Sequence, residues 1–217
     1  MLGKLFLGYD AREAVGFHVC VQSIIERSRF PFTISPIHGV RRDGTNDFTY
    51  ARFLIPYLCR FTGCALFIDG SDMLLREDIA GIFEYYDPSK AVSVVKHNYK
   101  TRHPRKYLGT PMEAANQDYP RKNWSSVMLF NCAHPGNAVL TGEYVNAHHG
   151  SHLHGMQWLQ ESEVGEIAPR WNVLIGEDGD EQDCALAHFT LGIPAFPRYA
   201  ACRYADEWLQ TFNRMVA

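Results

Sequence analysis

The sequence predicts one α/β domain over residues 1–217, with a Rossmann-like, mostly parallel sheet flanked by helices. The first observation behind this class is that short apolar runs alternate with helical patterns along the whole chain, as in folds built around parallel strands. The second is that no internal repeat and no Gly/Ser- or Pro-rich linker divides the 217 residues. A chain of this length can enclose one substantial core.

The first predicted elements are a strand, a helix and a second strand. Lys4–Tyr9 is a short apolar run that predicts a strand. Asp10 is expected to begin a helix, because Glu13 three residues later completes the pattern of a capping box before an apolar helical face. Phe32–His38 predicts the next strand.

The following segment predicts a helix that leads to a buried strand. Phe48–Cys59 has a helical pattern, which Pro56 is expected to bend or shorten. Cys64–Asp69 is a compact apolar run and predicts a buried strand, and Asp78–Tyr86 predicts a short helix.

The second half of the chain continues the alternation. Three further strands are predicted at Ala91–Lys96, Ser126–Cys132 and Ala185–Thr190. Three further helices are predicted at Asn137–Ala147, His152–Gln160 and Ala205–Val216. Ligands of such folds bind beyond the carboxyl ends of the strands, so the polar residues that follow each apolar run are the candidates for a site.

Composition excludes several classes of protein. The apolar share of 46% excludes a disordered chain. With 21 basic and 24 acidic side chains the net charge is -3, which gives no global field for nucleic acid. No apolar run approaches the roughly 18 residues of a membrane span, and Met1–Tyr9 is too short for a secretory signal. We therefore expect a cytoplasmic protein without nucleic-acid partners or a transmembrane segment.

The six cysteines are scattered and contain no C-x-x-C pair. Most have apolar neighbours, so we expect reduced and largely buried thiols rather than a disulfide framework.

The sharpest chemical feature is a pair of carboxylates after the strand Cys64–Asp69. Asp69 and Asp72 are separated by Gly70 and Ser71, which permit a tight turn. Carboxylate oxygens suit hard cations such as Mg²⁺ or Mn²⁺, and Mn²⁺ also accepts an imidazole. The alternative is that Asp72 caps the next turn and Asp69 only ends the strand.

Two further residues extend the candidate site. His188 lies on a late apolar strand and could complete an Asp/Asp/His set, although such a histidine is also common as a core residue. Gly192 follows it and would let backbone amides approach a phosphate. Arg52 lies on an otherwise apolar segment, and an inward arginine needs either a structural carboxylate or a bound phosphate group.

The order of five motifs resembles glycosyltransferase family 8, the glycogenin and bacterial lipopolysaccharide glycosyltransferase type with the GT-A fold. The resemblance covers Leu5 to about Phe196. The motifs are Tyr9-Asp10, Phe48-Thr49-Tyr50-Ala51-Arg52-Phe53-Leu54-Ile55-Pro56, Asp69-Gly70-Ser71-Asp72, Trp124-Ser125-Ser126-Val127-Met128-Leu129-Phe130-Asn131 and His188-Phe189-Thr190-Leu191-Gly192.

The resemblance implies transfer of a sugar from a nucleotide-sugar, usually a UDP-sugar, to a hydroxyl of a saccharide or glycolipid acceptor. It further implies help from Mn²⁺ or Mg²⁺ and retention of the anomeric configuration. The metal ligands that it implies are Asp69, Asp72 and His188, and Asp69 is also implied to contact the donor. It implies that Tyr9 and Asp10 lie beside the nucleobase. It places Arg52 near the donor sugar and diphosphate, and Ser125 and Ser126 beside the donor sugar.

The sequence also departs from the family's pattern. The carboxylate motif is D-x-x-D, one residue longer than D-x-D, and Trp124-Ser125-Ser126 stands where the family has Asn-Ser-Gly. The family's Asp-Gln pair and the lysine that follows its histidine motif are absent, and no residue can be assigned as the catalytic nucleophile. These departures motivate an alternative, a catalytically idle nucleotide-sugar-binding protein of the same fold.

Two polar segments remain. Lys96–Lys106 is the one basic run, and it is either a solvated loop or an acceptor-side flap, continued by Tyr107–Lys122 as a candidate lid. His148 and His152 have the i,i+4 spacing of a Zn²⁺ or Ni²⁺ site within a cluster of four histidines that also holds His149 and His154. The alternative for this cluster is a solvent-exposed helix junction, because Gly150 interrupts it.

Overall fold

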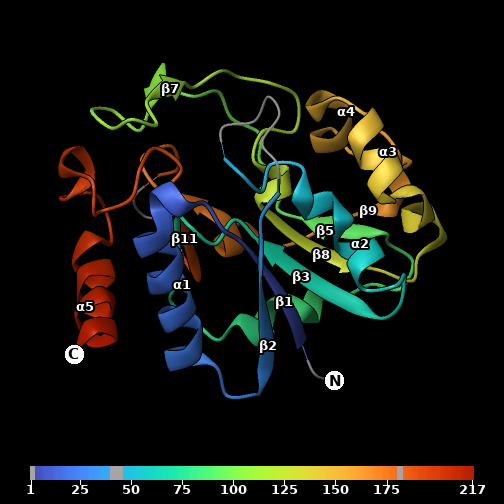
Figure 1. Cartoon of the computed structure of the whole chain (residues 1–217), viewed down its shortest axis with the longest axis horizontal. Coiled ribbons are helices and arrows are strands. Elements are labelled where there is room, and N and C mark those ends of the chain that lie inside the picture. Colours follow the sequence, from blue (N-terminus) through green and yellow to red (C-terminus); the bar gives the residue numbers. More distant parts are fainter. Residues whose placement is uncertain (1–2, 40–45, 180–182) are drawn as a thin grey trace.

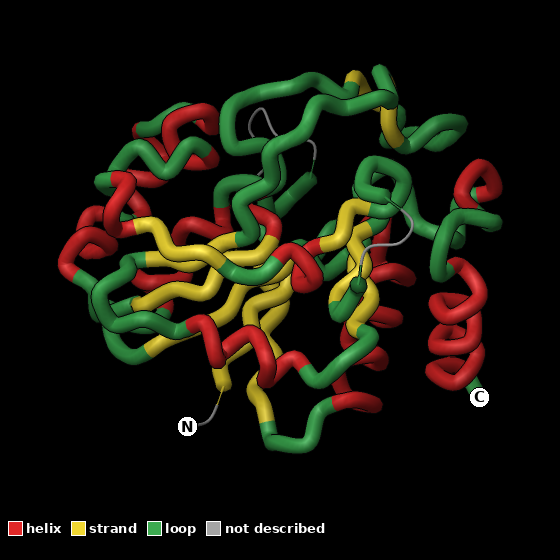
Figure 2. The backbone as a smooth tube through the Cα atoms, turned by 180° about the vertical axis from the view of Figure 1, so that it is seen from behind, coloured by secondary structure: helices red, strands yellow, loops and turns green. Residues whose placement is uncertain are grey.

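The computed structural model describes residues 3–39, 46–179 and 183–217. A central sheet with the strand order β2-β1-β3-β8-β5-β9 runs through the molecule, and helices lie on both sides of it (Figure 1). The predicted α/β class with a mostly parallel sheet is therefore confirmed. Viewed from behind, a long loop runs above the strands (Figure 2).

The predicted parallel arrangement is present in the first three strands. β1 (Gly3–Gly8) pairs in parallel with β2 (Phe32–Ile37) and with β3 (Cys64–Ile68). In the register, Leu7 lies opposite Ile68, so β1 and β3 end at the same edge of the sheet. The residues that follow the two strands are thus brought together.

The other half of the sheet contains its antiparallel strand. β8 (Val127–Asn131) runs antiparallel to both β3 and β5 (Val92–Val94), whereas β5 and β9 (Val164–Glu166) are parallel. β5 and β8 lie within predicted strands, while the sequence analysis missed β9.

Alternate residues of the strands face two different cores, as the pleat requires. Ala65 and Phe67 of β3 pack in the cluster that includes residues of three helices, α2 (Ile55–Leu58), α3 (Gly142–Ala147) and α4 (Gly150–His154). Leu66 and Ile68 pack in the cluster that includes Phe17 of α1 (Ala14–Arg27). The central strands β3 and β8 are buried on both sides, which explains why they are almost continuously apolar.

A second, smaller sheet has the order β10-β11-β4. Its strands are β10 (Val173–Leu174), β11 (Leu186–His188) and β4 (Met73–Leu75). β11 lies within the predicted strand Ala185–Thr190, whereas β4 and β10 were not predicted because runs of two or three residues give no periodic signal. A two-stranded ladder joins β6 (Arg105–Lys106) to β7 (Ala114–Ala115).

The helices are more broken than predicted. The α-helices are α1 (Ala14–Arg27), α2 (Ile55–Leu58), α3 (Gly142–Ala147), α4 (Gly150–His154) and α5 (Ala205–Val216). The 3₁₀ helices are Ala11–Glu13, Ala51–Leu54, Ile79–Tyr85, Trp124–Ser126, Pro135–Val139, Glu161–Glu163, Pro169–Asn172 and Pro197–Tyr199. Of the predicted helices, only Ala205–Val216 has the observed bounds.

Two of the differences have a local cause. Asp10 does cap a helix, but it accepts from the backbone of Arg12 and starts a 3₁₀ turn before α1, and Glu13 does not complete a capping box. Pro56 does not bend a long helix, because it lies in the first turn of α2, where a proline has no hydrogen bond to lose.

Two observations bear on the predicted cellular setting. All six cysteines are free thiols, and four of them are buried. No helix among the described residues is long and apolar enough to cross a membrane. The cytoplasmic location stays a prediction.

Candidate active site

The loop between β3 and β4 holds the two predicted carboxylates. Gly70 has φ of 71°, a conformation that favours glycine, and a Cβ there would lie 2.7 Å from the carbonyl oxygen of Gly8. Ser71 donates through Oγ to the same oxygen over 3.2 Å. Asp69 accepts a backbone hydrogen bond from Ser71, of 2.7 Å. The tight turn that the extra residue requires is therefore packed directly against the end of β1.

His188 reaches the carboxylates through the second sheet. It lies opposite Met73 in the β11–β4 ladder, and the next residue, Phe189, donates its amide to the backbone carbonyl of Asp72 over 2.8 Å. His188 Nε2 is 3.3 Å from Asp72 Oδ2 and 3.9 Å from Asp69 Oδ2. Asp69, Asp72 and His188 are all buried, and each offers a ligand atom within 4.8 Å of the others. The D-x-x-D spacing does not keep the two aspartates apart.

Burial and charge set the protonation of these three groups. Burial, together with the nearby Asp72, raises the pKa of Asp69 to about 6, although Arg52 acts in the opposite direction. Burial opposes ionisation of Asp72 as well, but the adjacent His188 outweighs it and lowers the pKa of that carboxyl. His188 is buried too, and Asp72 raises its pKa.

The same residues fit a divalent cation. Asp72 Oδ1 is buried and has no hydrogen-bond partner in the part of the chain that the structure describes. A buried acceptor without a donor is costly, and a cation removes that cost. Two carboxylates with one imidazole are a donor set that Mn²⁺ accepts, and Mg²⁺ accepts the oxygens.

Asn172 is a residue of the site that was not predicted from the sequence. The ring Nδ1 of His188 lies 2.9 Å from Asn172 Oδ1. The amide nitrogen of Asn172 donates to Ser126 Oγ over 3.2 Å and to the carbonyl of Asn123 over 3.3 Å, which leaves Oδ1 to accept. His188 Nδ1 therefore carries a proton and Nε2 faces the carboxylates, as in ligating histidines. No short motif surrounds this asparagine.

Arg52 lies beside Asp69, and the partner it was predicted to need is therefore a carboxylate of the chain itself. Its Nη1 is 2.5 Å from Asp69 Oδ1 and donates over 2.8 Å to the carbonyl of Ser125. The guanidinium carbon lies 4.9 Å from the centre of the Phe67 ring and 5.1 Å from that of Phe48. This packing orients the arginine and explains the apolar residues around it in the sequence.

A cleft of about 440 Å³ opens beside this group. Arg52, Asp69, Ser125 and Ser126 line it, as the sequence analysis expected of donor-binding residues. The other lining residues include polar side chains from four segments of the chain: Asn46 and Thr49; Lys106, Asn116, Gln117, Tyr119, Lys122 and Asn123; His149, Ser151 and His154; and Thr190.

Three of the predicted donor-binding residues do not line this cleft, and the predicted metal ligands Asp72 and His188 are not part of its lining either. Tyr9 packs edge-on against Phe17, with 5.1 Å between the ring centres. Asp10 is fully buried and accepts from Arg12 Nε over 2.8 Å and from the backbone of Asp47 over 3.1 Å, so both its oxygens have partners. Burial opposes the ionisation of Asp10, but these hydrogen bonds outweigh it and lower its pKa.

Gly192 is the third predicted donor-binding residue that does not line the cleft. Its amide donates to Phe189 over 2.9 Å, and a Cβ on it would lie 2.3 Å from the ring of Tyr199. Its left-handed conformation thus serves the turn after β11. The assignment of Gly192 to a phosphate stays a prediction.

The basic run and the candidate lid form one wall of the cleft. In Figure 1 this segment, which contains β7, extends over the sheet edge. The buried Glu177 holds it: Glu177 accepts from the hydroxyl of Thr101, from the backbone of Arg102 over 3.2 Å and from Asn116 over 3.3 Å. The segment is therefore anchored to the rest of the domain, although many of its residues are exposed.

The histidine cluster divides into two parts. His148 and His152 stack on each other with ring centres 4.4 Å apart, and His148 also stacks on Tyr144. They do not belong to the one possible metal group found among the described residues, so the i,i+4 metal site is not supported. His154, in contrast, faces the cleft, and its Nδ1 lies 2.6 Å from Ser125 Oγ. The sequence analysis missed this contact.

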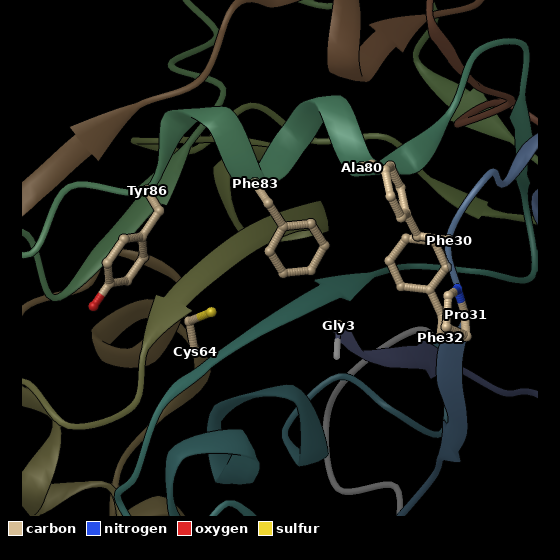
Figure 3. A pocket seen from close by; sticks show the side chains of 8 residues that line it. All are labelled: Gly3, Phe30, Pro31, Phe32, Cys64, Ala80, Phe83 and Tyr86. Atoms are coloured by element: carbon tan, nitrogen blue, oxygen red, sulfur yellow. The ribbon is translucent and has the colours of Figure 1, made fainter. Parts of the chain in front are cut away.

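A second cavity, of about 280 Å³, lies at the opposite edge of the sheet (Figure 3). Gly3, Phe32 and Cys64, which begin β1, β2 and β3, line it together with Phe30, Pro31, Ala80, Phe83 and Tyr86. This lining is mainly apolar and holds no carboxylate or cationic group. The cleft at the carboxyl ends of the strands is therefore the candidate active site.

The chain has a relative among curated proteins and similar folds among solved structures. No protein-family model matches the chain. The chain is 38% identical over 224 residues to Protein CDI of Arabidopsis thaliana, which covers 95% of this chain and 84% of that protein. This chain belongs to the Protein CDI family.

Among solved structures the similar proteins are glycosyltransferases. The apo structure of the bifunctional glycosyltransferase WbbM aligns with a TM-score of 0.60 and 13% identity, and GlyE of Streptococcus pneumoniae TIGR4 with 0.63 and 11%. The chain is covered to 97% and 100% in these two alignments but spans only 49% of the WbbM chain and 62% of the GlyE chain.

A third match extends over both chains. The galactosyltransferase LgtC, in complex with donor and acceptor sugar analogues, aligns with a TM-score of 0.58 and 13% identity over 99% of this chain and 96% of its own. At such identities the likeness shows the fold. The GT-A fold predicted from the five motifs is therefore confirmed.

Proposed function

We propose that this protein is a metal-dependent glycosyltransferase that moves a sugar from a nucleotide-sugar to an acceptor hydroxyl. The observation that carries the proposal is the convergence of Asp69, Asp72 and His188 beside a polar cleft, at the carboxyl ends of the strands of a GT-A fold. This is where ligands bind in open α/β sheets.

The donor is proposed to be a UDP-sugar and the acceptor a saccharide or glycolipid. Supporting this, the cleft combines hydroxyl, amide and cationic side chains, which suit sugar hydroxyls and an anionic diphosphate. The structurally similar LgtC was solved with donor and acceptor sugar analogues bound to it, which supports a donor and an acceptor sugar as the ligands of this cleft.

The chemistry needs stabilisation of a leaving diphosphate. The bond from the anomeric carbon to the diphosphate oxygen breaks and leaves its electron pair on that oxygen. The acceptor hydroxyl oxygen forms the new bond to the anomeric carbon, and its proton passes to water. A divalent ion held by Asp69, Asp72 and His188 would supply Lewis-acid neutralisation of the diphosphate. Arg52 holds Asp69 in place, and Ser125 and Ser126 offer hydroxyls at the wall of the cleft.

We further propose retention of the anomeric configuration, on the resemblance to family 8. On the same resemblance we propose that Tyr9 and Asp10, which follow β1, lie near the nucleobase. Asp10 would hold the loop there in shape by accepting hydrogen bonds from Arg12 and from the backbone of Asp47. Gly192 would act on the turn that follows His188.

Calorimetric titration of UDP into the protein, with and without MnCl₂, tests the proposal. We expect binding that requires the ion and is abolished by EDTA. A panel of nucleotide-sugars is then assayed for slow hydrolysis to the nucleoside diphosphate. UDP binding that is indifferent to Mn²⁺ would refute metal dependence, and metal-dependent binding without any turnover would favour the idle nucleotide-sugar-binding alternative.

A further inference from the structure

Lys106 is a cationic residue of the cleft that neither the motifs nor the metal group explains. It lies on β6, within the basic run, and lines the same cleft as Arg52, Asp69 and Thr190. A half-buried charged side chain at this position calls for a physical reason.

The backbone around Lys106 is fixed from two sides. Lys106 pairs with Ala114 in the β6–β7 ladder, and the amide of the next residue, Tyr107, donates over 2.7 Å to Leu191 in the turn after β11. Tyr107 itself has φ of 56° and is buried. Leu108 donates to the hydroxyl of Tyr199 over 2.9 Å. The base of the Lys106 side chain is thus held beside the strand that carries His188.

The ammonium group of Lys106 has no direct anionic partner. Within residues 3–39, 46–179 and 183–217 it forms no ion pair within 4.0 Å and donates no hydrogen bond, although it lies 5.0 Å from the centre of the Tyr107 ring. Its charge interacts at longer range with Asp72, Asp69 and Glu13. Burial, which outweighs these three carboxylates, lowers the pKa of Lys106.

The contrast with Lys122 shows that this arrangement is unusual within the cleft. Lys122 Nζ is 2.8 Å from Asn116 Oδ1 and 3.5 Å from Asp118 Oδ1, so its charge is satisfied by the chain. Lys106 has the opposite environment, since it shares the lining of the cleft with Asp69 and interacts with Asp69 and Asp72 without forming an ion pair with either of them. An anion bound to a cation at Asp69 and Asp72 would give it a direct partner.

We propose that Lys106 donates from its ammonium group to the diphosphate of the nucleotide donor, in the cleft that it lines together with Asp69. This inference rests on the proposed function and adds to it a specific phosphate-binding residue. Lys106 would neutralise part of the charge of the diphosphate, in a half-buried setting where a charged hydrogen bond is strong.

The test compares Lys106→Met and Lys106→Arg with the wild type, using UDP with MnCl₂, MnCl₂ alone, and uridine as three separate calorimetric probes. Lys100→Met is the matched control, since Lys100 lies in the same basic run but is exposed. For Lys106→Met we expect UDP affinity to fall by about 10- to 100-fold, in line with the loss of a charged hydrogen bond. Mn²⁺ alone should bind as tightly as in the wild type or more tightly, because a positive charge near the carboxylates has been removed.

Two further results are expected. Lys106→Arg should recover part of the UDP affinity, and uridine, which has no phosphate, should bind all variants equally. Unchanged UDP affinity in Lys106→Met would overturn the inference while leaving the proposed function intact. Equal losses of Mn²⁺ and UDP binding would overturn it in favour of a structural role. If the wild type shows no Mn²⁺-dependent binding of UDP, the proposed function fails and this inference with it.

Discussion

Asn172 accepts a hydrogen bond from His188 over 2.9 Å, and this contact determines which ring nitrogen faces the carboxylates. We expect Asn172→Leu to weaken Mn²⁺ binding by about 10- to 100-fold, as when an outer partner of a ligating histidine is lost. Calorimetry with MnCl₂ measures the change. Asn172→Asp keeps an acceptor and should retain more affinity than Asn172→Leu, so equal losses in both variants would contradict this role.

Asp72 is expected to be essential for binding the ion. Asp72→Asn removes the charge while keeping the size of the side chain, and it should abolish Mn²⁺-dependent UDP binding and any turnover of a nucleotide-sugar. Asp206→Asn, at an exposed position of α5, is the matched control and should behave as the wild type. A fully active Asp72→Asn protein would show that the metal assignment is wrong.

Arg52 is expected to contribute to stability through its buried ion pair with Asp69. Arg52→Met leaves a buried carboxylate without its partner, which costs about 3 kcal/mol or more in the free energy of unfolding. Urea denaturation measures this loss, and Mn²⁺ should restore part of it by replacing the lost positive charge. Arg29→Met, at an exposed position, should cost little. A loss no larger than that of Arg29→Met would mean that the ion pair is not important for folding.

Gly70 and Gly63 form a matched pair for testing the turn between the two aspartates. Both have left-handed backbones, with φ of 71° and 68°, but a Cβ on Gly63 would meet nothing within 4 Å, whereas one on Gly70 would collide with Gly8. We expect Gly63→Ala to lower the free energy of unfolding by about 1 kcal/mol and Gly70→Ala by about 3 kcal/mol. Only Gly70→Ala should also weaken Mn²⁺ binding, and equal effects would argue against the close approach to β1.

The ion pair of Glu26 with Arg214 joins α1 to α5 and predicts a pH-dependent stability. Arg214 donates to both oxygens of Glu26 over 2.8 Å and lowers the pKa of this carboxyl to about 2. Because the folded pKa is depressed, the contribution is complete above the ordinary pKa of 4.5 and is lost as the pH falls toward 2.

Thermal unfolding of the wild type and Glu26→Gln at pH 6 and pH 3 measures this effect. Both side chains are partly exposed, so solvent screening limits the contribution to about 1 kcal/mol at pH 6. The difference between the two proteins should shrink at pH 3. A difference of the same size at both pH values would show that it does not arise from ionisation of Glu26.

The central strands and the candidate metal ligands could be predicted because short stretches of sequence are sufficient to indicate them. The apolar runs Cys64–Asp69 and Ser126–Cys132 correspond to β3 and β8, and Asp69 and Asp72 follow their strand directly. The pairing of His188 with these aspartates followed from the order of motifs, and the β11–β4 ladder explains how the distance along the chain is bridged.

The other features of the fold and of the candidate site depend on tertiary contacts, which no local sequence pattern indicates. Asn172 and His154 act through single hydrogen bonds to residues far away in the sequence, so their spacing carries no signal. The helical segments were predicted too long, because apolar residues that face the core over short 3₁₀ turns have the same spacing as those of a continuous helix. The left-handed Tyr107 likewise depends on its packing.

The proposed metal ligands come from both sheets, and this has a mechanical consequence. Asp69 ends a strand of the six-stranded sheet, while Asp72 and His188 adjoin neighbouring strands of the three-stranded sheet. An ion shared by all three would act as a clamp across the junction of the two sheets. A movement of one sheet relative to the other would separate the three ligands. Substitutions of buried residues between the two sheets should therefore weaken metal binding and activity, even though these residues do not line the cleft.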